Sequence, residues 1–202
     1  MKAILGTKGR MTEVFDDKGV VTPATIINAT PMVATHIKTT EKDGYNAVQF
    51  GTGTRKEKNI SKPVLGHLKG LANFRTLREL PSDGEINRGD SVTVSIFVPG
   101  DVVSVSAVSK GKGFQGVVKR HGFHGGPRSH GQKNKERAPG SISGGGRAGG
   151  RVSKGMRMAG RLGGDLVTVK NLRVVQVDEA SGIILISGAV PGRPGTVVEI
   201  RG

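Results

Sequence analysis

The sequence predicts a mainly β protein: a split antiparallel β-barrel core, a small α/β insert, and a long, irregular, basic, glycine-rich extension loop. Three observations support this prediction. Short segments alternate apolar and polar residues, glycine and proline turns separate them, and one long segment shows neither strand nor helix periodicity. The expected division is residues 1–29, 89–108 and 162–202 for the barrel core, 30–88 for the insert, and 109–161 for the loop.

Strand segments follow one another along the chain. The N-terminal "MKAILGTKGRMTEVF" enters a strand directly. Further strands are expected at residues 20–28, 32–39, 45–51, 91–98, 101–109, 165–170, 172–177, 182–190 and 196–201. The "PG" at 99–100 predicts a turn that joins two of these strands, and "DEASG" at 178–182 predicts a hairpin loop between two others.

Residues 54–80 differ from the rest of the insert. They contain seven basic and two acidic residues. The leucines and Phe74 within "HLKGLANFRTLREL" are spaced three apart, which predicts a short helix lying on the sheet, although Gly70 weakens helix propensity. A stripe with this spacing indicates core packing more often than a groove for a partner.

The positive charge is concentrated in one segment. The 202-residue chain has a net charge of +15, and residues 109–161 contribute +12, with thirteen Lys or Arg residues and one acid, Glu136. Such a segment predicts a polyanionic partner. The chain has no cysteine, which excludes disulfides and thiolate metal sites. It has no apolar run of signal-peptide length and none near the roughly 20 residues that span a bilayer, so we expect a cytoplasmic protein with no membrane partner.

The basic segment cannot form a core of its own. It contains fifteen glycines and two prolines, and its apolar residues are isolated. We therefore expect it to become ordered when it threads between RNA phosphates. The predicted RNA-binding side chains are Lys110, Lys112, Lys119, Arg120, His121, His124, Arg128, His130, Lys133, Lys135, Arg137, Arg147, Arg151, Lys154, Arg157 and Arg161. Close approach of the backbone to RNA is predicted at Gly111, Gly113, Gly116, Gly144, Gly145, Gly146, Gly149 and Gly150.

The run "GKGFQG" at 111–116 matches the G-x-G-x-x-G pattern of nucleotide-binding loops. A dinucleotide site also needs a helix after the last glycine, and here glycine and proline interrupt "VVKRHGFHGGP". The acidic residue expected about twenty positions later would have to be Glu136, inside a basic loop. A nucleotide-dependent enzyme is therefore disfavoured, and we expect no cofactor and no small-molecule substrate.

Three histidines have the spacing H-x2-H-x5-H, at His121, His124 and His130. They have no nearby thiolate and lie among cations that repel a metal ion, so hydrogen bonding or stacking with RNA is favoured over a metal site. No nucleophile–base–acid combination stands out, and no catalytic residue is predicted.

Several runs resemble, in order, the bacterial-size family of large-subunit ribosomal protein three. They are "SKGKGFQGVVKRHGF" (109–123), "SHG" (129–131), "APGSIS" (138–143), "KGMRMAGRLG" (154–163), "VTVKNLRVVQVD" (167–178) and "GAVPGRPG" (188–195). "ILGTKGRMTEVF" and "DGYNAVQFGTG" (43–53) fit the same family, so the resemblance covers nearly the whole chain.

The resemblance implies a barrel on the surface of the large ribosomal subunit and a loop that extends through ribosomal RNA towards the peptidyl transferase centre. It also implies direct binding of 23S-type rRNA near its 3′ end, a role early in subunit assembly, and no catalytic activity. The neighbours it implies are ribosomal proteins fourteen and nineteen of the same subunit.

Some positions depart from the family pattern. Arg10 precedes Met11 where the family usually has glycine, Ser143 replaces the last glycine of "GSIG", and Ser104 stands where Asp or Asn is usual. Many bacterial members carry a loop-tip glutamine that can be methylated. The nearest position here is Arg147, in a stretch one residue longer, so methylation at this position is disfavoured.

The alternative hypothesis is a free-standing nucleic-acid-binding or RNA-chaperone protein that combines a β-barrel with a basic arm. Retention on ribosomal particles at high salt distinguishes it from a ribosomal constituent, because an integral subunit protein stays bound.

Overall fold

The structure, a computed structural model, describes residues 2–16, 18–81, 86–144 and 149–202. The chain divides into two compact units. The first, residues 1–108 and 166–202, holds a barrel and a second sheet. The second, residues 109–165, is called the arm.

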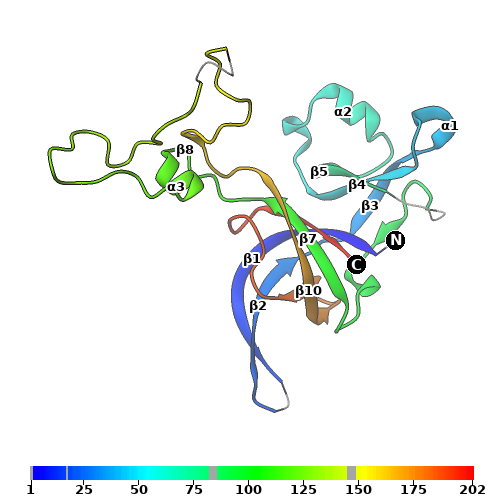
Figure 1. The fold of residues 1–202 in the computed structure, drawn as a ribbon. Coiled ribbons are helices and arrows are strands. Elements are labelled where there is room, and N and C mark those ends of the chain that lie inside the picture. The colour runs from blue at the N-terminus through cyan, green and yellow to red at the C-terminus, as the bar shows by residue number, and fades with distance from the viewer. Residues whose placement is uncertain (1, 17, 82–85, 145–148) are drawn as a thin grey trace. The chain divides into compact units, whose positions relative to one another are not determined.

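Six strands close an antiparallel barrel in the order β1, β12, β7, β10, β11, β2 (Figure 1). Their bounds are Ala3–Phe15 (β1), Val21–Asn28 (β2), Val102–Val108 (β7), Leu166–Asp178 (β10), Ile183–Ser187 (β11) and Val197–Arg201 (β12). Alternation in the sequence determines which side chains face inward. In β7, for example, Val103, Val105 and Ala107 are buried and the residues between them are not. The predicted mainly β fold with a barrel core is confirmed, and so is the hairpin loop between β10 and β11.

The two strands predicted at 165–170 and 172–177 form one continuous strand, β10. Asn171, between them, has a φ of 58°, in the left-handed region. The pairing of β10 with β7 shifts register between Val169 and Leu172. Asn171 therefore forms a bulge, which bends the strand and lets it continue around the barrel. Asparagine tolerates this conformation better than most residues.

The second sheet has the order β5, β4, β3, β6. Its strands are Met32–Lys38 (β3), Ala47–Thr54 (β4), Phe74–Pro81 (β5) and Ser91–Val92 (β6). The helices of this unit are Thr40–Asp43 (α1) and Lys62–His67 (α2), with 3-10 turns at Glu57–Asn59 and Val94–Ile96.

The helix predicted over 67–80 is wrong. The helix of this region, α2, ends at His67. The second half of the predicted stretch belongs to the strand β5, which pairs with β4. Gly70 between them has a φ of 84°, which ends the helical turn. Pairing with the edge of β4 outweighed a helical propensity that Gly70 already weakened.

The strand predicted at 91–98 is also wrong in its length. Only Ser91–Val92 forms a strand, and it pairs with β3. The turn before β7 does form, with Gly100 at a φ of 96°. Both edges of β7 are occupied by β12 and β10, so the preceding segment has no edge to pair with.

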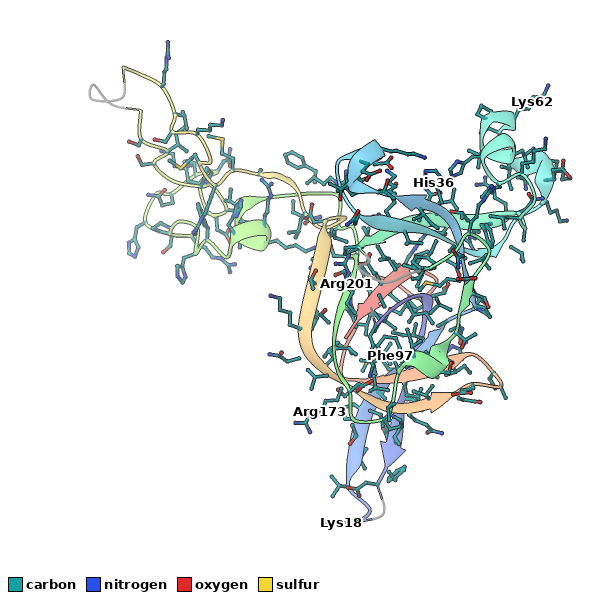
Figure 2. The ribbon with its side chains drawn as sticks, turned by 90° about the vertical axis from the view of Figure 1, so that its right-hand side faces the viewer. Lys18, His36, Lys62, Phe97, Arg173 and Arg201 are labelled. Carbon is teal, nitrogen blue, oxygen red and sulfur yellow. The ribbon has the colours of Figure 1, made fainter. Side chains whose placement is uncertain are left out.

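One hydrophobic core joins the barrel and the second sheet. Phe50 and Leu80 of the second sheet are fully buried in the same cluster as Ile4, Ile184 and Ile200 of the barrel. Figure 2 shows side chains filling the space that the barrel strands enclose, with Lys18 at the tip of the β1–β2 hairpin away from this core. The barrel and the second sheet therefore stabilise each other.

The arm contains more regular structure than the sequence predicts. It holds a two-stranded pair, Phe114–Gln115 (β8) with Gly160–Arg161 (β9), and the short helix Val117–His121 (α3). The rest of the described arm forms loops (Figure 1). Within the described ranges, no helix is long and apolar enough to cross a membrane.

Candidate nucleic-acid interface

The arm begins and ends in a backbone ladder, which we call the arm root (residues 109–116 and 158–165). The Ser109 N–H donates to the Asp165 carbonyl at 2.8 Å, and the Lys112 N–H donates to the Leu162 carbonyl at 2.9 Å. Gly163 lies in this ladder with a φ of 72°, and a Cβ there would come within 2.1 Å of the Lys110 carbonyl oxygen. The sequence therefore builds a fixed base for the arm from backbone hydrogen bonds and a required glycine.

Helix α3 fastens the returning strand to this root. Its Val117 side chain is buried. Arg120 donates from Nη1 to the Met158 carbonyl at 2.7 Å, and His121 Nε2 lies 3.1 Å from the same oxygen. Two of the predicted RNA-binding side chains thus have a structural role inside the arm, and their contact with RNA stays a prediction.

A first loop closes next to α3. The Gly126 N–H donates to the Glu136 carbonyl at 2.9 Å, and a Cβ on Gly125 would come within 1.9 Å of the same carbonyl oxygen. Arg128 Nε pairs with the Glu136 carboxylate at 2.7 Å. Both side chains are exposed enough that this pair contributes little to stability. Glu136 therefore offsets one cation of the loop and leaves the others unchanged.

A hollow of about 730 Å³ lies between this loop and the chain that follows it. His121, His124, Lys135 and Arg157 line it, together with Phe123. The structure thus brings four predicted RNA-binding residues, from three separate parts of the arm, around one concave surface. Its volume and its mixed cationic and aromatic lining suit a nucleotide-sized group.

Most of the predicted cations are exposed to solvent. The exposed ones are Lys110, Lys112, Lys119, Arg128, Lys133, Lys135, Arg137, Arg151, Lys154, Arg157 and Arg161, with His124 and His130 exposed beside them. Arg147, Gly145 and Gly146 lie outside the described residues. Within the described part of the arm, Arg128–Glu136 is the only ion pair. Nearly all of the arm's described cations therefore face solvent without an acidic partner.

The first unit differs from the arm because its acids nearly balance its cations, and three of its cations form ion pairs. Lys2 pairs with Asp101, Arg201 with Glu199, and Lys38 with Glu79. Lys38 also donates a hydrogen bond to the Tyr45 hydroxyl, which with the Glu79 pair raises the pKa of Lys38 further above its usual value. The same lysine lowers the pKa of Glu79. Both groups stay ionised at neutral pH and largely cancel each other's charge.

The predicted close-approach glycines fall into two groups. Gly113, Gly144, Gly149 and Gly150 have positive φ values, which favour glycine whatever lies nearby. A Cβ on Gly111 or Gly116 would meet no atom within 4 Å, and neither has a positive φ. No contact within the described protein requires glycine at these two positions, so they leave open space beside the backbone for a ligand.

Replacing both Gly111 and Gly116 with Ala should change the free energy of unfolding of the isolated protein by less than about 0.5 kcal/mol relative to the wild type. Binding to large-subunit rRNA should weaken by roughly 1 kcal/mol for each backbone hydrogen bond that the new methyl groups block. Thermal melting and a binding titration measure the two effects. As the matched control, Gly163→Ala should disrupt the root and expose the Lys112 and Leu162 amides to fast hydrogen exchange. Unchanged rRNA affinity in the double variant would contradict the prediction.

One position relevant to the site was not predicted. Phe114, in β8, is 76% exposed. The signal in the sequence is a single aromatic residue among lysines and glycines. Ser143, where the sequence departs from the family pattern, has a φ of 59°, in the left-handed region that serine adopts less readily than glycine.

Among the described residues, no three His, Asp or Glu side chains gather closely enough to hold a metal ion. The helix α3 does follow "GKGFQG", but it has only five residues. The barrel and the exposed cationic arm together have the properties of a protein that binds a polyanion.

Comparison with known proteins identifies the family. The model of the family "Ribosomal protein L3" matches residues 84–183. The "Large ribosomal subunit protein uL3" of Herpetosiphon aurantiacus is 49% identical, over 99% of this chain and 95% of its own length. Those of Finegoldia magna and Acidothermus cellulolyticus are 46% and 47% identical over 100% of this chain and 97% and 92% of their own lengths.

The chain belongs to the ribosomal protein L3 family. The resemblance predicted from the sequence is confirmed. Family membership gives the chain a structural role in the ribosome, and the prediction that it is not an enzyme agrees with that role.

Proposed function

We propose that this protein is a constituent of the large ribosomal subunit in the cytoplasm and that it binds 23S-type rRNA directly through the arm. The observation that supports this most is the charge of the arm. Residues 109–161 have a net charge of +12, and nearly all of their described cations are exposed. Each phosphate that such a surface neutralises releases counterions, which favours binding.

The finer parts of the proposal follow from the family. The arm extends through rRNA towards the peptidyl transferase centre, while the protein binds near the 3′ end of the rRNA and supports early subunit assembly. Ribosomal proteins fourteen and nineteen are the proposed neighbours. The arm root suits this role, because its hydrogen bonds hold the two ends of the arm together while RNA orders the loops beyond it.

Sedimentation of ribosomal particles at high salt tests the proposal. We expect the protein to stay with large-subunit particles, since an integral constituent makes many contacts that salt alone does not break. Release into the supernatant at moderate salt would instead support the free-standing RNA-binding alternative.

Photo-crosslinking tests the contact between the arm and rRNA. A photo-crosslinking residue at Val152, which is 41% exposed in the arm, should label rRNA. The same residue at Val20 of the β1–β2 hairpin serves as a control outside the arm.

A further inference from the structure

Phe114 is the most exposed of the large apolar side chains in the described residues, at 76%. It does not lie on a loose loop. β8 pairs with β9, and the Leu162 N–H donates to the Gly113 carbonyl at 3.0 Å directly beside it. The root therefore holds an aromatic ring in water on a backbone that is already ordered.

The surroundings of Phe114 are cationic. Arg161 lies directly opposite it in the β8–β9 pair, and opposite residues of an antiparallel pair project on the same face. A Cβ on Gly164 would come within 2.5 Å of Arg161 Nη2, so the glycine makes room for this guanidinium. Lys112, two residues before Phe114, is exposed. An aromatic face is thus bordered by charges that attract phosphate.

A single exposed apolar side chain is common on protein surfaces and by itself indicates nothing. Phe15, at the end of β1, shows the ordinary case, because it is 65% exposed between Glu13 and Asp16. Phe114 differs in three respects: its neighbours are cations, its backbone is fixed by the root, and Gly111 and Gly116 leave open space on either side. A flat, polyanionic ligand fits all three.

We propose that an unpaired nucleobase of RNA stacks on the ring of Phe114, with its flanking phosphates contacting Lys112 and Arg161. This inference rests on the proposed function and adds the chemistry of one contact. Every base has a π face, so stacking requires an unstacked nucleotide and no particular sequence. Duplex RNA hides its base faces and would not use this contact.

The chain contains no tryptophan, so Phe114→Trp introduces a single fluorescent reporter at the site. Titration with protein-free large-subunit rRNA should quench its fluorescence by stacking, and a fully paired RNA duplex should quench it much less. The matched control, Phe15→Trp, places the same reporter at a similarly exposed phenylalanine with acidic neighbours. It should not be quenched by either RNA.

Affinity measurements separate stacking from general apolar contact. Phe114→Ala and Phe114→Leu should each weaken rRNA binding by about tenfold to a hundredfold, whereas Phe114→Tyr should bind nearly as wild type. The salt dependence of binding should not change, because no charge is removed. All three variants should melt like the wild type, because the ring makes no core contact.

Wild-type affinity in the Ala variant, with binding otherwise intact, would overturn the stacking inference and leave the proposed function standing. Failure of the wild-type protein to bind rRNA at all would overturn the proposed function itself. If Phe114→Trp is unaffected by rRNA but its emission shifts to the blue with ribosomal proteins, the ring contacts a protein and the inference is wrong.

Discussion

Removal of residues 125–155, with the ends joined by a short Gly/Ser linker, should reduce the slope of log affinity against log salt by about 3. The deletion removes seven Lys or Arg residues and Glu136, a net change of −6. Each lost phosphate contact lowers the slope by roughly 0.7 to 0.9, and about half of the seven cations are expected to contact phosphate.

The structure shows why this variant should still fold. β8, α3 and β9 lie outside the deleted range, as do Arg120 and the Met158 carbonyl that it holds. The Arg128–Glu136 pair is removed as a whole, so the deletion leaves no partner of that pair behind. Residual binding should persist through Lys110, Lys112 and Lys119.

The two slopes are obtained by measuring affinity for a large-subunit rRNA fragment at several salt concentrations. The intact and shortened proteins are measured side by side. Equal slopes would show that the deleted loops are not the electrostatic contact. Loss of folding, seen as the loss of a cooperative melt, would show that these loops belong to the core.

Phe50→Ala should lower the free energy of unfolding by about 3–5 kcal/mol, the usual cost of emptying a buried phenylalanine site. Phe50 is fully buried in the core that the barrel and the second sheet share. We therefore expect the barrel and the second sheet to unfold in one transition at lower denaturant concentration, since neither keeps a complete core alone.

Chemical denaturation followed by circular dichroism measures this change. Phe15→Ala, which truncates an exposed phenylalanine, is the control and should change stability by less than about 0.5 kcal/mol. Two separate transitions in Phe50→Ala, the first confined to the second sheet, would show that the two sheets are independent.

The barrel could be predicted because the alternation of apolar and polar residues along each strand shows which side chains face inward. In β7 and β12, apolar residues alternate with others, and Val105, Val198 and Ile200 are buried as that pattern requires. Local sequence was sufficient there. Residues 74–80 were mispredicted because their conformation depends on pairing with β4, whose paired residues lie at least twenty positions earlier in the chain. The spacing of leucines within one segment cannot show that the edge of β4 is free for pairing.

The composition of the arm was sufficient to predict its charge and its exposed cations, but not the contacts within it. The cations were identified because the net charge of a segment depends only on its sequence and not on its conformation. The structural role of Arg120 was not, because its partner, the Met158 carbonyl, lies 38 residues further along the chain. Likewise, the prediction that the segment lacks regular structure missed α3 and the β8–β9 pair, whose hydrogen bonds join its two ends. Phe114 was overlooked because exposure is a property of the folded chain.

The arm leaves the barrel after Val108 and returns at Leu166, and these two residues are paired neighbours in β7 and β10. For the barrel, the entire arm is therefore the loop of one hairpin whose ends are already closed. The free-energy cost of closing such a loop, which is entropic, rises only with the logarithm of its length, by about 0.6 kcal/mol for each doubling. Insertions and deletions in the arm thus leave the barrel's register and stability almost untouched.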